Sequence, residues 1–236
     1  MLLSMLSQLR SEVRVICMAC VVCEQPLQQE NDICPECIEL LQKTSRLFDR
    51  TLMLHSREWH KMRVLGSYEG LLAKLISKAK FGHRAELFVH LANLLGSHVQ
   101  EHLISDSFTA PDLFNSNVLN SKLLMTSVPM PFWRKFRRGF NQSELIMQQL
   151  SKQLGNDTND QLVQHTGSSR VQHFLNKQQR LSNRQHVFHC VGEVPKRVIV
   201  VDDVITTGAT MSAICQRLKA GGAEYIEVWA LALTPK

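Results

Sequence analysis

One short segment near the C-terminus restricts the fold more than any other part of the chain. Residues 198–201 are an apolar, β-branched run, followed by two adjacent acids, Asp202 and Asp203, and by a hydroxyl-rich turn. Residues 211–220 then have a helical pattern that ends at two glycines, and the apolar stretch 226–233 follows. Strand, helix and strand in this order predict a parallel sheet, because parallel strands need a crossover connection.

The turn after the acid pair has the chemistry of a phosphate site. Gly208 allows the backbone to approach an anion, and the N–H groups that open the following helix point toward it. Three hydroxyl groups can add hydrogen bonds, those of Thr206, Thr207 and Thr210. Asp202 and Asp203 stand at the sheet edge where α/β folds bind ligands, and carboxylates accept hydrogen bonds from a diol. The segment therefore predicts a ribose 5-phosphate site, and the alternative is an ordinary strand-to-helix turn with aspartate capping.

Most of the seven cysteines crowd into residues 17–37, which favours a metal site over a distributed set of disulfides. Two CxxC pairs would offer four thiolates to one tetrahedral Zn²⁺, those of Cys20, Cys23, Cys34 and Cys37. Cys17 lies one CxxC step upstream and competes with Cys20 as a ligand. The other interpretation is that these are reduced, buried cysteines that only pack.

The acid pair and the turn 206–210 resemble the loop with which type I phosphoribosyltransferases bind 5-phosphoribosyl 1-diphosphate (PRPP). In that family the acids contact the ribose hydroxyls and the turn holds the 5-phosphate. The order of several short motifs along the chain resembles the ComF/GntX family. These motifs are the CxxC pairs, residues 68–70, 80–82, 128–131 and 138–142, and finally the loop. Its members are phosphoribosyltransferase-like proteins linked to DNA uptake in natural transformation, with relatives tied to gluconate utilisation. A polar stretch before the loop, with Arg170, Arg180 and Asn183, fits the same pattern.

The resemblance implies an α/β fold, with a type I phosphoribosyltransferase-like parallel sheet and flanking helices over residues 60–236. Residues 1–45 would form a small zinc-ribbon or zinc-knuckle domain with a structural Zn²⁺. The implied ligand is PRPP or a related phosphoribosyl compound. If the site is catalytic, the protein is a pentosyltransferase with an unassigned nucleophile, and Mg²⁺ bridges the diphosphate and the ribose hydroxyls. The alternative is a non-catalytic module that keeps this fold and binds single-stranded DNA or a partner in the DNA-uptake machinery.

The segment 132–140 carries four cations and interleaved aromatic residues, and the formal net charge of +6 also favours anionic partners. The cations are Arg134, Lys135, Arg137 and Arg138. As a mobile loop, the segment would clamp diphosphate with its guanidinium groups. As a strand-binding surface, it would stack bases on Trp133 or Phe136. As a solvated basic turn, it would pack its aromatic rings inward.

Apolar residues at helical spacing predict helices at 71–79, 86–99 and 143–154. The polar segment 105–121, which contains Pro111, is predicted to be a loop. No apolar run approaches the roughly 18 residues of a membrane span. Residues 1–8 carry no basic residue before their apolar stretch, unlike a secretory signal. We therefore expect a cytoplasmic protein without a membrane span.

Overall fold

The computed structural model describes residues 19–27, 33–44, 48–49, 58–82, 84–109, 123–166 and 187–235. Cys17 and the polar stretch with Arg170, Arg180 and Asn183 lie outside these residues. The chain forms two compact units, Met1–Thr44 and Ser45–Lys236, and each is described by itself.

A five-stranded sheet with the order β1-β2-β7-β6-β3 forms the centre of the larger unit. Its strands are β1 (Phe48–Asp49), β2 (Lys61–Ser67), β3 (Leu124–Ser127), β6 (Arg197–Ile205) and β7 (Tyr225–Leu233). β2, β7, β6 and β3 are parallel, and β1 pairs antiparallel with β2 at one edge. The sheet and its flanking helices confirm the α/β fold class predicted from the sequence.

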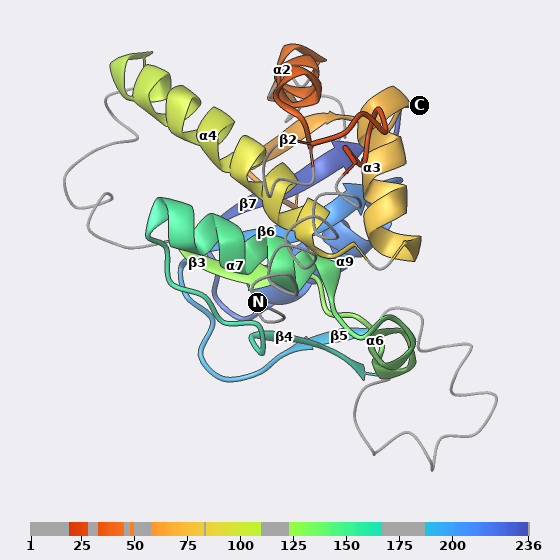
Figure 1. Ribbon diagram of the computed structural model, residues 1–236. Coiled ribbons are helices and arrows are strands. Elements are labelled where there is room, and N and C mark those ends of the chain that lie inside the picture. The colour runs from red at the N-terminus through yellow and green to blue at the C-terminus, as the bar shows by residue number, and fades with distance from the viewer. Residues whose placement is uncertain are drawn as a thin grey trace, which may run out of the picture. The chain divides into compact units, whose positions relative to one another are not determined.

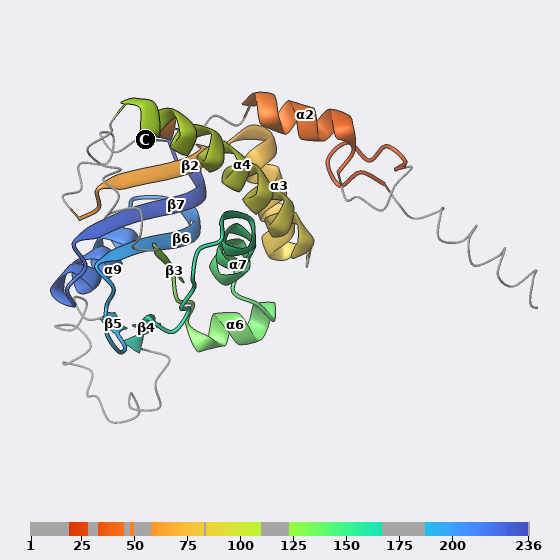
Figure 2. The same cartoon turned by 90° about the vertical axis from the view of Figure 1, so that its left-hand side faces the viewer.

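Helices cover both faces of this sheet. α3 (Gly70–Phe81), α4 (Glu86–Thr109) and α7 (Gln142–Leu154) lie on one face, and α9 (Ala209–Ala220) lies on the other (Figure 1, Figure 2). The apolar residues of α3 repeat at helical spacing, so that Leu72, Leu75, Ile76 and Ala79 are all buried. On the α9 face, Met211, Ile214 and Leu218 pack in one core with the β-branched residues of β6 and β7. Burial on both faces explains why these strands are almost continuously apolar.

Two elements differ from the sequence-based expectation. α4 continues to Thr109, although residues 105–109 were predicted as part of a loop. Their serine and aspartate are weak helix formers but do not end a helix, and the first proline after them is Pro111. The basic segment, expected as a loop or turn, is the short helix α6 (Phe132–Arg138). It follows Pro131 and ends at Gly139, whose φ of 81° suits glycine.

A separate antiparallel ribbon completes the larger unit. It pairs β4 (Val163–His165) with β5 (Phe188–Cys190). In both views the ribbon and α6 lie at the same end of the sheet (Figure 1, Figure 2). This end therefore gathers elements that are distant in the sequence.

The described part of the smaller unit consists of a cysteine-bearing turn and α2 (Pro35–Thr44). The turn is closed by an isolated bridge between Ala19 and Pro26. Within the described ranges of the whole chain, none of the helices has both the length and the apolar character that crossing a membrane requires.

Candidate functional site

A cavity of about 560 Å³ lies in the larger unit beside the acid pair. Its walls come from the end of α3, the segment after β3, α6, the start of α7, the β4–β5 ribbon, β6 and α9. A second hollow of about 40 Å³ is lined by the hydroxyl-rich turn, and both hollows share Asp202, Ala209 and Thr210. The predicted acid pair and phosphate turn therefore line two adjacent hollows. This space lies beyond the carboxyl ends of parallel strands, where open α/β sheets bind ligands.

The two acids have different partners. The Ser143 hydroxyl donates to Asp202 Oδ1 at 2.8 Å, and the backbone N–H of Asp203 donates to the same oxygen at 2.9 Å. Asp203 Oδ1 accepts from the Val204 N–H at 2.7 Å, while its Oδ2 lies 2.6 Å from Lys80 Nζ. Burial, and then the neighbouring Asp203 carboxylate, raise the pKa of Asp202 to about 7, against the opposing effect of its hydrogen bonds. Asp203 is therefore paired with a cation, whereas Asp202 is protonated more readily than an ordinary aspartate.

The turn between β6 and α9 has the backbone that its sequence predicts. Gly208 adopts a φ of 78° at the N-cap of α9, a left-handed conformation that favours glycine. The Ala209 N–H donates to Thr207 Oγ1 at 3.4 Å, which orders the turn. Thr206, Thr207 and Thr210 are exposed along the small hollow. The N-terminus of a helix and threonine hydroxyls together make a site suited to a phosphate group.

The four cations of the basic segment lie in different surroundings. Arg134 and Arg138 line the cavity, whereas Lys135 and Arg137 are not among the residues that line it. Lys135 Nζ lies 3.0 Å from Glu144 Oε2, and the Arg137 guanidinium lies over the Trp133 ring at 5.8 Å. The structure therefore distinguishes two cations that line the cavity from two that do not. Arg134 and Arg138 also lie beside exposed rings, at 5.0 Å from Trp133 and 5.6 Å from Phe81.

The aromatic rings of α6 point outward. Phe132, Trp133 and Phe136 are 68%, 58% and 83% exposed, and Phe81 at the end of α3 is 70% exposed. Phe132 and Phe136 stack with ring centroids 6.4 Å apart, and Arg138 lies 5.6 Å from the Phe81 ring. The interpretation of a turn with inward-packed rings is therefore wrong for these residues. We call Phe81, Phe132, Trp133 and Phe136 the aromatic surface.

Several polar residues that line the cavity were not predicted as part of the site, among them Lys80, Gln142 and His165. Lys80 and Gln142 occur in motifs that carry the family resemblance, but nothing in the sequence assigns them a role. The side-chain oxygen of Gln142 is buried and has no hydrogen-bond partner among the described residues, so it can accept from a ligand. His165 lies edge-on to Phe188, and burial followed by the charge of Arg134 lowers its pKa. His165 carried no sequence signal, because its position depends on the pairing of β4 with β5.

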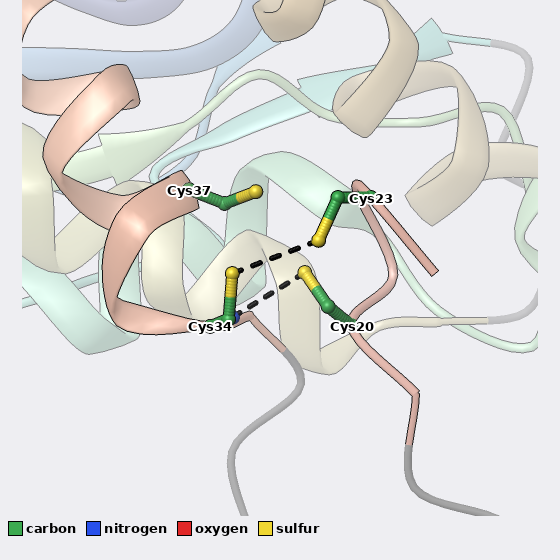
Figure 3. A group of neighbouring side chains, drawn as sticks. All are labelled: Cys20, Cys23, Cys34 and Cys37. Carbon is green, nitrogen blue, oxygen red and sulfur yellow. Dashed lines mark hydrogen bonds between the residues drawn. The ribbon is translucent and has the colours of Figure 1, made fainter. Parts of the chain in front are cut away.

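The smaller unit brings four cysteines together (Figure 3). The sulfur atoms of Cys20, Cys23, Cys34 and Cys37 all lie within 4.8 Å of one another. Cys23 Sγ and Cys34 Sγ are 3.7 Å apart, close to the roughly 3.8 Å that a tetrahedral ion with bonds of about 2.3 Å requires. Burial opposes ionisation of Cys20, but N–H groups of Cys23, Cys34 and Val22 donate to its sulfur and lower its pKa to about 6. These thiols could hold a structural metal such as zinc.

The chain is similar to proteins of one known family. Residues 116–236 match the family model described as "Phosphoribosyl transferase domain". The DNA utilization protein YhgH of Escherichia coli (strain K12) is 31% identical over 218 residues, which cover 91% of this chain and 90% of the relative. Competence protein F of Haemophilus influenzae is 33% identical over 178 residues, with 74% and 73% coverage. Competence protein ComFC of Streptococcus pneumoniae is 22% identical over 229 residues, with 97% and 92% coverage.

Proposed function

Since the chain belongs to the ComF family of phosphoribosyltransferase-like proteins, we propose that its cavity binds PRPP or a related phosphoribosyl ligand. One observation carries the proposal, namely that the acid pair and the phosphate turn line adjacent hollows that share Asp202, Ala209 and Thr210. A phosphoribosyl compound presents a phosphate and a diol at fixed separation, and the two parts of the site offer partners of matching chemistry. Family membership alone would not suffice, because function depends on the site rather than on the fold.

Each part of the cavity has a distinct role in this proposal. The turn 206–210 and the first N–H groups of α9 hold the 5-phosphate, and Asp202 and Asp203 accept hydrogen bonds from the ribose hydroxyls. Arg134 and Arg138 bind the diphosphate, because guanidinium groups form paired hydrogen bonds with phosphate oxygens. In a transfer reaction, an acceptor nucleophile would displace diphosphate at the anomeric carbon, and these cations would stabilise its charge.

The cavity suits a ligand that brings its own Mg²⁺. Among the described residues that line it, the acids are Asp202 and Asp203, and Asp203 is already paired with Lys80. When bound, Mg²⁺ would neutralise part of the diphosphate charge and so favour its departure. Asp202 and Asp203 would hold it through the hydroxyls that they orient.

Calorimetric titration with PRPP and Mg²⁺ tests the proposal. Asp202→Asn with Asp203→Asn removes two charged hydrogen bonds, each worth about 1.5–3 kcal/mol, so affinity should fall roughly a hundredfold or more. Asp157→Asn with Asp160→Asn removes the same charge outside the cavity and should bind PRPP as the wild type does. Wild-type affinity in the acid-pair variant, with folding verified by its melting transition, would refute the site assignment.

The aromatic surface supports a second candidate function, the binding of single-stranded DNA. Exposed rings with neighbouring cations can stack bases while arginine and lysine contact phosphates. Contact with four phosphates would give a slope of about −3 for log affinity against log salt. This function does not require transfer chemistry, so the two candidates are compatible with one chain.

The separation of the four cations provides matched variants for the two candidates. Lys135→Ala with Arg137→Ala should weaken single-strand binding and reduce its salt slope, while PRPP affinity stays unchanged. Arg134→Ala with Arg138→Ala should reduce PRPP affinity, because these side chains line the cavity. It should also weaken single-strand binding, because the same side chains lie beside Trp133 and Phe81. If the wild type shows no salt-dependent binding to single-stranded DNA at low ionic strength, the second candidate is wrong.

The names of the relatives support a cellular role in DNA utilisation or competence. We expect a strain that lacks this gene to be impaired in the use or uptake of added DNA. The wild-type gene should restore the phenotype, and the acid-pair variant should not. Restoration by the acid-pair variant would separate the cellular role from the phosphoribosyl site.

A further inference from the structure

Lys80 is held in place by the end of a helix rather than by a loose loop. It lies in the last turn of α3, and Gly82 is the C-cap of this helix. A side chain at residue 82 would meet the Lys78 carbonyl oxygen at 2.6 Å, so glycine permits this close helix end. A lysine near a helix C-terminus is also favoured by the helix dipole. The backbone therefore presents the Lys80 side chain to the sheet edge at a defined place.

The ion pair of Lys80 with Asp203 is largely removed from solvent. The side chains are 15% and 6% exposed, and Nζ lies 2.6 Å from Oδ2. Asp203 Oδ1 accepts a hydrogen bond from the Val204 N–H. Oδ2 accepts no hydrogen bond from the described residues, and its partner is the ammonium group of Lys80 in the ion pair. Asp202 differs, because its partners are the neutral Ser143 hydroxyl and a backbone N–H.

This asymmetry bears on what the acid pair can bind. Two adjacent carboxylates in a cavity offer the oxygen ligands that a divalent cation prefers. A lysine ammonium group beside one of the carboxylates blocks one carboxylate oxygen and compensates one negative charge. It also repels a metal ion, and this repulsion is strong where little water screens the charges. A neutral hydroxyl meets no such repulsion and can still donate to the remaining lone pairs.

We propose that Lys80 is a specificity-determining residue. Its ammonium group is the counter-ion of Asp203 and prevents free divalent cations from binding to the acid pair, so that the pair binds hydroxyl groups instead. The identification of those hydroxyls as ribose hydroxyls rests on the proposed function, whereas the exclusion of cations does not. In this arrangement a divalent cation enters the cavity with the diphosphate that carries it, not before it.

The test uses Mn²⁺ alone, followed by electron paramagnetic resonance and by the shift in melting temperature, with no phosphoribosyl ligand present. Before the Mn²⁺ titrations, the protein is loaded with zinc, so that the cysteine site does not take up manganese. Wild-type protein should bind Mn²⁺ no better than the Asp203→Asn variant. Lys80→Met should bind one Mn²⁺ at least about tenfold more tightly and gain thermal stability from it.

Further variants separate this role from a merely structural one. Lys80→Arg keeps the charge and should exclude Mn²⁺ as the wild type does, and Lys80→Met with Asp203→Asn should lose the acquired site. Lys80→Gln keeps a hydrogen-bond donor without the charge and replaces Lys80→Met if that protein does not fold. Equal Mn²⁺ affinity of wild type and the uncharged variants would overturn the proposal. Because PRPP is absent, this outcome is independent of whether the chain binds PRPP.

Discussion

Asp202→Asn should stabilise the ligand-free protein at neutral and alkaline pH, although it removes a site residue. Asp202 is a half-buried carboxylate next to Asp203. The loss of water around it and the neighbouring charge raise its pKa to about 7. The folded protein therefore retains a proton on Asp202 at pH values where the unfolded chain has released it. The stability that this proton contributes is complete below about pH 4 and is lost as the pH rises through about 7.

The size of the effect follows from the change in pKa. A rise from the ordinary value of 3.8 to about 7 corresponds to about 4 kcal/mol, at 1.36 kcal/mol for each pH unit. The net gain is smaller, because the asparagine amide accepts weaker hydrogen bonds from Ser143 and the Asp203 N–H than a carboxylate does. We expect Asp202→Asn to raise the free energy of unfolding by about 1–2 kcal/mol at pH 8, or roughly 2–8 °C in melting temperature.

Thermal denaturation of both proteins from pH 4.5 to pH 8 measures this difference. The stability advantage of Asp202→Asn should grow between about pH 4 and pH 7 and then remain constant. Asp160→Asn, which changes the same charge outside the cavity, is the control and should show no comparable trend. If the difference in stability does not vary with pH, or if the wild type is the more stable protein at pH 8, ionised Asp202 does not destabilise the folded protein and the reasoning is wrong.

Three further predictions concern other parts of the chain. Purified protein handled without chelator should contain about one zinc per chain, and Cys34→Ser should lose the metal and unfold only the smaller unit, because a structural zinc contributes on the order of 10 kcal/mol. Glu227→Gln should lower the free energy of unfolding by about 3 kcal/mol, because it removes the carboxylate that lies 3.2 Å from the buried Arg63 guanidinium. Chemical denaturation measures this free energy. Gly208→Ala should weaken PRPP binding and cost about 1 kcal/mol, whereas Gly208→Asn, which tolerates a φ of 78°, should cost less in a melting assay.

The sequence predicts those parts of the site that are local in the chain. The acid pair, the glycine and the threonines of the turn follow one another between β6 and α9, so one strand-to-helix connection places them together. The same connection determines that β6 and β7 are parallel and adjacent. The two CxxC pairs are similarly local, and their four sulfurs meet in the smaller unit. In each case the pattern and the structure are linked by a few residues of backbone.

The basic segment shows where local patterns do not suffice. Its composition predicts contact with an anion, but composition does not reveal which cation faces the cavity. That depends on the formation of α6, because Arg134 and Arg138 are four residues apart and therefore share a helix face. The helix leaves Lys135 beside Glu144 of α7 and leaves the aromatic rings exposed. The division between cavity and outer surface is thus a property of the folded helix.

The remaining site residues depend on contacts between segments that are far apart in the sequence. Lys80 reaches Asp203 only because α3 packs on the sheet with its C-terminal end near the carboxyl ends of β6 and β3. Ser143 reaches Asp202 because α7 begins directly after α6, across the same edge. These two contacts make the acids unequal, because Asp203 is paired with a cation whereas Asp202 has a neutral hydroxyl as its side-chain partner. Burial and the neighbouring Asp203 raise the pKa of Asp202, and the Ser143 hydrogen bond only opposes this effect. In the sequence the acids are identical neighbours, and any difference in what they bind arises from tertiary structure alone.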